Sequence, residues 1–157
     1  MPGKNLRDRI RMTEDEVEEF LSAPRTLQVA TINPDGTPHL VAMWYVVRAG
    51  QLAFWTYGRS QKVQNLRRDP RISCMVEEGE PGDYGSLRGV SVKGTAEVVE
   101  DRDVVVQLGE DIAAQYFGGL DDAGRAGVAH TSTKRVAVIV TPTRVLSWDH
   151  RKLSSGG

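Results

Sequence analysis

The stretch LRGVSVKGTAEVVE, residues 87–100, decides the fold class of this chain. Small or apolar residues stand at every second position from Val90 to Val98, with polar or charged residues between them. A period of two is typical of a β-strand that buries one face. Gly89 and Gly94 lie inside the pattern, and glycine within a strand indicates a bulge or a bend, as at the corner of a barrel. The stretch therefore predicts a long, bent strand of a small barrel.

Further strand-like segments lie on both sides of this stretch. Toward the N-terminus there are four, the first three joined by short turns as in a meander: TLQVATI (26–32), HLVAMWYVV (39–47), QLAFWTY (51–57) and RISCMVE (71–77). Toward the C-terminus, residues 134–149 indicate either a strand pair or one long strand bent at Pro142. About six strands and few helices predict a mainly β protein built as a small antiparallel barrel.

Three segments carry the pattern of a helix: MTEDEVEEFL (12–21), SQKVQNLRR (60–68) and DRDVVVQLGEDIAAQYFGG (101–119). Thr13 and Glu16 have the spacing of a capping box, which marks the start of the first helix. Gly118 and Gly119 end the third. Residues 120–133 fit either a short helix or a loop.

Length and composition bound the function. The 157 residues suit one domain, which we place across 1–157 with a flexible tail at 1–12. Twenty Lys and Arg residues oppose 21 Asp and Glu residues, and a net charge of -1 argues against a nucleic-acid partner. The single Cys74 excludes a disulfide framework. No apolar run is long enough to cross a bilayer, so we expect a soluble, cytoplasmic protein with no membrane partner.

The common catalytic motifs are absent from the sequence. It contains no G-x-S-x-G, Walker A or G-x-G-x-x-G pattern. His39, His130 and His150 stand far apart and in no metal-ligand spacing, so we expect no metal site and name no catalytic side chain. If the chain is an enzyme, a cofactor carries the reactive atoms and the protein binds and orients it.

The stretch WTYGRSQKVQNLRRDP, residues 55–70, offers a place for such a cofactor. A strand ends at Gly58, and Ser60 can cap the helix that follows. The N-terminus of a helix presents free amides and the positive end of its dipole to an anion, and Arg59 and Lys62 add full charges. Short basic helices are also common as solvated surface. The residues alone support a phosphate site and a solvated face about equally.

Four segments together resemble one superfamily: residues 29–47, 52–77, 87–101 and 134–153. They are similar to the split β-barrel flavin and deazaflavin oxidoreductases of the pyridoxamine 5'-phosphate oxidase-like superfamily. The turn SQKVQNLRRDPR and the ending TPTRVLSWDHRKL most resemble the actinobacterial group that uses coenzyme F420, a deazaflavin. The resemblance implies a six-stranded antiparallel split β-barrel of the FMN-binding type. It also implies a homodimer with two cofactor sites at the subunit interface.

The resemblance assigns cofactor contacts to ten residues: Ala42, Met43, Trp44, Trp55, Thr56, Ser60, Gln61, Lys62, Arg67 and Trp148. The turn at 60–62 would hold the cofactor phosphate, and the tricyclic ring would lie against the segment 42–44 and against Trp55. Arg67, with Arg59 or Arg68, could pair with the carboxylates of a polyglutamate tail. Trp148 would approach from the partner subunit.

The implied activity is transfer of a hydride from reduced coenzyme F420 to an unsaturated organic substrate. One alternative is an FMN-dependent oxidoreductase of the same fold, and another is a non-enzymatic protein that binds flavin or haem. The ending SWDHRKL lacks the full set of Arg and His residues that pyridoxamine phosphate oxidases carry, so that oxidation is not expected. The substrate, the proton donor and the role of residues 118–134 stay open.

Overall fold

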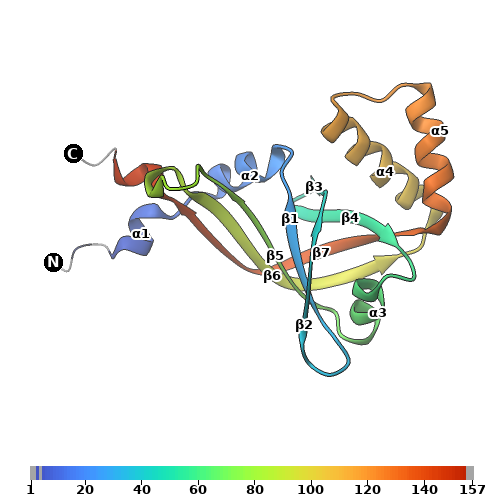
Figure 1. Ribbon diagram of the computed structural model, residues 1–157, viewed down its shortest axis with the longest axis horizontal. Coiled ribbons are helices and arrows are strands. Elements are labelled where there is room, and N and C mark those ends of the chain that lie inside the picture. The colour runs from blue at the N-terminus through green and yellow to red at the C-terminus, as the bar shows by residue number, and fades with distance from the viewer. Residues whose placement is uncertain (1–2, 4, 155–157) are drawn as a thin grey trace.

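The computed structural model describes residue 3 and residues 5–154. The described residues form one antiparallel sheet in the order β2-β1-β5-β6-β7-β4-β3 (Figure 1). Its strands are β1 (Leu27–Ile32), β2 (Pro38–Met43), β3 (Val46–Arg48), β4 (Gln51–Tyr57), β5 (Arg71–Glu78), β6 (Arg88–Val99) and β7 (Arg135–Asp149). A mainly β chain of the split-barrel type is thereby confirmed. The C-terminal segment is one long strand, which settles the alternative that the sequence left open.

A bulge bends the two longest strands where the sequence places Gly94. Strands β6 and β7 pair along their whole length, with one register shift between Lys93 and Gly94, which lies opposite Pro142. A Cβ atom added to Gly94 would lie 2.1 Å from the carbonyl oxygen of Thr141. Only glycine therefore allows the two backbones to approach this closely. The bend in the stretch at 87–100 is confirmed at Gly94.

The expected strand count of six is wrong by one, because the segment HLVAMWYVV does not form a continuous strand. It breaks at Trp44 and Tyr45 between β2 and β3. Tyr45 turns fully into the core, where its hydroxyl donates to the carbonyl oxygen of Leu21 at 2.8 Å. Its backbone N–H donates to the hydroxyl of Tyr116 at 3.2 Å instead of to a neighbouring strand. These two contacts with distant segments interrupt the ladder.

Five α-helices stand around the sheet: α1 (Leu6–Ile10), α2 (Glu14–Ser22), α3 (Gln61–Arg68), α4 (Arg102–Phe117) and α5 (Asp122–Thr131). The described residues also form three short 3₁₀ helices: η1 (Tyr84–Ser86) between β5 and β6, η2 (Ser132–Lys134) between α5 and β7, and η3 (His150–Leu153) after β7. The capping box of Thr13 and Glu16 is confirmed at the start of α2. The uncertain segment at 120–133 is helical, because Asp121 caps α5 and Arg102 donates to the carbonyl oxygen of Ala129 at 3.2 Å.

The segment expected as a flexible tail, residues 1–12, is largely ordered. It contains helix α1, and the side chains of Ile10 and Met12 are buried. The backbone N–H of Met12 donates to Ser147 Oγ at 3.0 Å, which fixes the segment to β7. Residues 1, 2 and 4 of that range lie outside the described residues.

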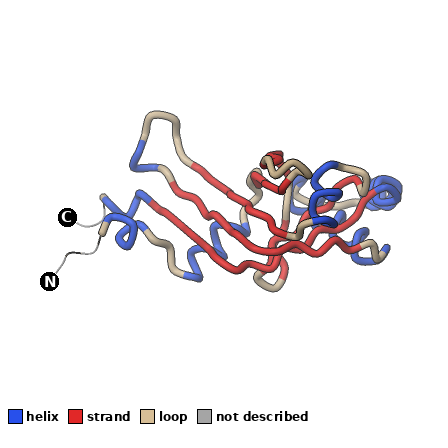
Figure 2. Tube along the Cα trace, turned by 90° about the horizontal axis from the view of Figure 1, so that it is seen from below, coloured by secondary structure: helices blue, strands red, loops and turns tan. Residues whose placement is uncertain are grey.

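Two hydrophobic clusters fix the position of the helices. The larger fills the interior of the sheet beneath α2, around Tyr45, Phe54 and Leu27. The smaller packs α4 onto β3, β4 and β7 through Val105, Leu108 and Ile112. Helices α4 and α5 stand at one end of the molecule, and α1 stands beside η3 at the other (Figures 1 and 2).

Candidate functional site

A cavity of about 1290 Å³ lies between the sheet and the helices α4 and α5. Its sheet side is formed by Ala42, Met43 and Trp44 at the end of β2, Trp55 of β4 and Arg135 of β7. Its helix side includes Ile112 and Phe117 of α4, the linker 118–121, and one face of α5. The structure thus brings together four of the ten residues that the sequence assigned to cofactor binding.

Trp55 forms the floor of this cavity. Its ring lies against the backbone of α4, because a Cβ atom added to Gly109 would stand 2.4 Å from it. The guanidinium carbon of Arg135 stands 4.6 Å from the ring centroid of Trp55 and 4.4 Å from that of Tyr57. Such a cation–π position is favourable and holds the arginine against the floor of the cavity. Arg135 Nε is buried without a hydrogen-bond partner among the described residues.

Sequence reasoning missed Arg135. It precedes the apolar run VAVIV and carries no motif of its own. Its importance comes from strand register, which places it opposite Tyr57 at the end of β4. Only a prediction that β4 pairs with the last strand of the chain would have placed Arg135 beside the turn at 58–62. The sequence gives no signal that chooses this pairing over others.

The turn after β4 contains a half-buried cation, Lys62, and a buried hydroxyl without a hydrogen-bond partner among the described residues, that of Ser60. Lys62 Nζ donates to Thr56 Oγ1 at 2.8 Å, and Thr56 is buried. Burial lowers the pKa of Lys62, and the nearby charge of Arg135 lowers it further. Ser60 is the N-cap of α3, yet its hydroxyl oxygen is buried and has no hydrogen-bond partner among the described residues.

The two cations lack a balancing carboxylate. Lys62 and Arg135 form no ion pair with any Asp or Glu in the part of the chain that the structure describes. Two like charges that are partly withdrawn from water repel each other unless an anion joins them. Together with the first turn of α3 and the free Ser60 hydroxyl, they form a site suited to a phosphate group.

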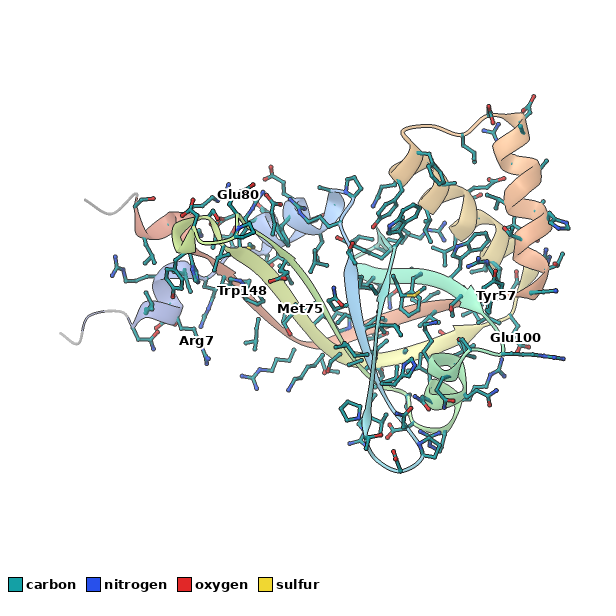
Figure 3. The ribbon with its side chains drawn as sticks, in the orientation of Figure 1. Arg7, Tyr57, Met75, Glu80, Glu100 and Trp148 are labelled. Atoms are coloured by element: carbon teal, nitrogen blue, oxygen red, sulfur yellow. The ribbon has the colours of Figure 1, made fainter. Side chains whose placement is uncertain are left out.

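Of the remaining sequence-assigned residues, Gln61 belongs to this turn, whereas Arg67 and Trp148 do not. Gln61 Nε2 donates to Asn65 Oδ1 at 2.9 Å along α3. Arg67 forms an ion pair with Glu100 at 2.6 Å and does not line the cavity. Figure 3 shows Trp148 far along the sheet from Tyr57, so within one chain Trp148 does not reach the cavity. The ring of Trp148 packs on the backbone of Gly89, because a Cβ atom at residue 89 would stand 2.3 Å from that ring.

Aromatic rings form the outer rim of the cavity. Trp44 stacks on Tyr116 with ring centroids 4.5 Å apart, and Phe117 meets Trp44 edge-on at 5.5 Å. Phe117 is nevertheless 72% exposed and Trp44 is 46% exposed. Large aromatic side chains at an open cavity offer flat apolar surface to a planar ligand.

Other classes of site find less support. No three His, Cys, Asp or Glu side chains gather as a metal site among the described residues. His150 Nδ1 lies 2.9 Å from the carbonyl oxygen of Tyr84, and neither residue lines the cavity. Within the described ranges, no helix is long and apolar enough to cross a membrane.

The family model for pyridoxamine 5'-phosphate oxidase matches residues 13–149. The chain therefore belongs to the pyridoxamine 5'-phosphate oxidase family. A curated pyridoxine/pyridoxamine 5'-phosphate oxidase from Kineococcus radiotolerans is 32% identical over 85 residues, which are 54% of this chain and 36% of that protein. The chain thus matches only about a third of the length of that relative. The names of the family and of the relative both describe oxidoreductases.

Solved structures resemble the whole chain. A conserved hypothetical protein from Mycobacterium tuberculosis is 43% identical, with a TM-score of 0.89 over 96% of this chain and 93% of that one. A structure named F420 reductase is 28% identical, with a TM-score of 0.65 over 85% of this chain and 98% of that one. An FAD-binding protein from Mesorhizobium loti, 21% identical over 87% of this chain and 94% of that one with a TM-score of 0.63, shares the fold.

Proposed function

We propose that this protein is an oxidoreductase that binds reduced coenzyme F420 and passes a hydride to an unsaturated organic substrate. The anion site at the end of the aromatic cavity carries this proposal. Arg135 Nε and Ser60 Oγ have no hydrogen-bond partner among the described residues, and Lys62, which donates to Thr56 Oγ1, has no carboxylate partner there. A phosphate would satisfy all three, and it would neutralise two cations that otherwise repel each other.

The cavity beside this anion site suits a flat ring system. Trp55 and the backbone of β2 at Ala42 and Met43 form its sheet side. When bound, the deazaflavin supplies the hydride at its own ring, so the protein needs no nucleophile. The side chains of this chain would hold the phosphate, orient the ring and exclude water from one face of it. Family membership and the similarity to a structure named F420 reductase support this reading.

The preference for F420 over FMN would depend on cations outside the phosphate turn. Arg67 and Arg68 are less available for this than the sequence suggested, since Arg67 pairs with Glu100 and Arg68 donates to the carbonyl oxygen of Ile32. Arg59 is exposed and forms no ion pair among the described residues, so it is the best placed to meet a polyglutamate tail. FMN has the same phosphate and remains the alternative cofactor.

We also propose a homodimer. Exposed apolar side chains lie on the edge strand β2 and on the outer half of β7: Leu40, Trp44, Val145 and Leu146. A second copy that covers these strands would remove this surface from water. Trp148 of a partner copy could then reach the cavity, as the resemblance implies.

A spectroscopic assay tests the proposal. The purified protein is mixed with reduced F420 or reduced FMN and a panel of conjugated acceptors, and cofactor oxidation is followed by absorbance. The proposal expects substrate-dependent oxidation of F420. Binding of haem with no activity from either cofactor would contradict it and favour a carrier protein.

A further inference from the structure

The outer half of the cavity has no role in holding the cofactor phosphate or the sheet side of the ring. It lies between Phe117 and one face of α5, formed by Gly124, Gly127, Val128 and Thr131. These positions follow the spacing i, i+3, i+4 and i+7, so they share one side of the helix. The linker of Gly118, Gly119 and Leu120 closes the space between the two helices.

The cavity is larger than a pocket for one small ligand. Pockets for a single small ligand usually measure roughly 300–1,000 Å³. This cavity measures about 1290 Å³. Space therefore remains once a tricyclic ring lies against Trp55.

The chemistry of the outer half defines what fits there. Its residues are apolar, aromatic or glycine, apart from Thr131 and the single carboxylate of Asp121. Among the lining residues that the structure describes, the one cation is Arg135, which lies on the opposite side beside Trp55. An anionic group in the outer half would meet no cation among these lining residues and would be repelled by the carboxylate of Asp121.

Glycine sets the width of this space. A Cβ atom added to Gly127, Gly118 or Gly119 would meet nothing within 4 Å. Helix α5 therefore does not need glycine at residue 127 for packing. Glycine in a helix interior lowers the free energy of unfolding by about 1 kcal/mol relative to alanine. At this position glycine leaves open space beside Phe117 at the mouth of the cavity.

We infer that the outer half of the cavity, between Phe117 and the glycine face of α5, binds the substrate, and that the substrate is a neutral, planar aromatic compound. The inference rests on the proposed function, since it assumes that the cofactor occupies the sheet side. It assigns a role to residues 118–131, which the sequence left without one.

Two fluorescent probes of equal shape test this inference: neutral 9-anthracenemethanol and anionic 9-anthracenecarboxylate. Each is titrated into the wild-type protein, alone and after addition of F420. We expect the neutral probe to bind in both cases, and more tightly than the anionic one by roughly tenfold or more, the scale on which a buried charge is rejected.

Gly127→Leu adds a side chain to the outer half, at a position where a Cβ atom meets nothing within 4 Å. We expect it to weaken binding of the neutral probe by about 10–200-fold, as for a blocked apolar pocket, and to leave F420 affinity unchanged within about twofold. Ala126→Leu adds the same side chain on the exposed side of α5 and should change neither. Phe117→Ala, at a position that is 72% exposed, should weaken the probe without unfolding the protein.

The outcomes separate the two claims. Unchanged probe affinity in Gly127→Leu and Phe117→Ala, or tighter binding of the anionic probe, overturns the substrate site even when F420 binds. Failure of the wild-type protein to bind either F420 or FMN counts against the proposed function, whatever the probes do.

Discussion

Arg135 and Lys62 are two neighbouring cations that no carboxylate among the described residues neutralises. Arg135 is held over Trp55 and Tyr57, and Lys62 is half-buried against Thr56. Neither side chain is bound by a carboxylate in the described part of the chain. A half-buried lysine beside another cation is costly to keep charged, and an anion between Lys62 and Arg135 offsets that cost.

Removing the charge of Lys62 tests its role directly. Lys62→Ala should weaken F420 binding by about 1.5–3 kcal/mol, the scale of a hydrogen bond to a charged group. Calorimetric titration measures the change. Arg71→Ala removes the same charge from an exposed residue that pairs with Asp69, and it should leave the affinity unchanged. Equal affinities in Lys62→Ala and wild type would mean that the basic turn is only solvated surface.

The lowered pKa of Lys62 gives this site a pH dependence. A phosphate group favours the charged form of Lys62, so binding raises that pKa and takes up a proton. Affinity is therefore highest below the pKa of free Lys62 and falls as pH rises through it, at a pH below the usual 10.5. Lys62→Arg keeps its charge and should stay flat over the same alkaline range. A parallel decline in both proteins would place the titrating group elsewhere.

At the scale of the elements, helix α4 shows why a glycine can be indispensable in one helix and replaceable in another. Gly109 lies directly on the ring of Trp55, whereas Gly127 of α5 faces open space. Replacing glycine by alanine therefore creates a clash at residue 109 of α4 and no clash at residue 127 of α5.

Gly109→Ala and Gly127→Ala form a matched pair for this point. Gly109→Ala should destabilise the fold by about 1–3 kcal/mol, because the new methyl group displaces the Trp55 ring. Gly127→Ala should stabilise it by about 0.4–1 kcal/mol. Thermal unfolding measures both changes. Stabilisation by Gly109→Ala would contradict the packing of Trp55 on α4, and destabilisation by Gly127→Ala would contradict the open space at Gly127.

Local patterns predicted the elements better than their interruptions. The alternation and glycines of residues 87–100 gave the bent central strand, and the capping box gave α2. The break at Trp44–Tyr45 was missed, because its causes are contacts with Leu21 and with Tyr116, 71 residues away. Helix α5 remained undecided, since its glycines indicate a loop while its cap and its packing on α4 favour a helix.

Some residues of the candidate site could be predicted from the sequence and others could not. The turn at 58–62 and the apolar end of β2 could be found from motif and resemblance. Arg135 could not, because only the pairing of β4 with β7 brings it there. The ion pair that holds Arg67 at Glu100 was equally invisible, since the two residues lie on separate elements.

At the scale of the whole molecule, the long strands β6 and β7 run from the end where α4 and α5 stand to the opposite end, where α1 lies (Figure 1). Residues 141–146 of β7 are exposed throughout, Val145 and Leu146 among them. A strand with both faces open and apolar side chains on it is typical of a surface that another chain covers.

We therefore expect a dimer at micromolar concentration, measured by light scattering. Leu40→Glu, on the edge strand β2 where the side chain is 67% exposed, should shift the protein toward monomer, because the interface would bury an unpaired charge. Circular dichroism checks that the variant is folded. A wild-type protein that is monomeric at these concentrations contradicts the proposed assembly.

The identity of the cofactor is the central claim, and competitive titration with F420 and FMN at low and high salt tests it most directly. Both cofactors carry a phosphate and a tricyclic ring, so the difference comes from the glutamate tail of F420 near Arg59. Exposed charge pairs contribute roughly 0–1 kcal/mol each and are screened by salt. We predict that F420 binds more tightly than FMN and that the preference shrinks as ionic strength rises. Tighter binding of FMN at every salt concentration would contradict the account.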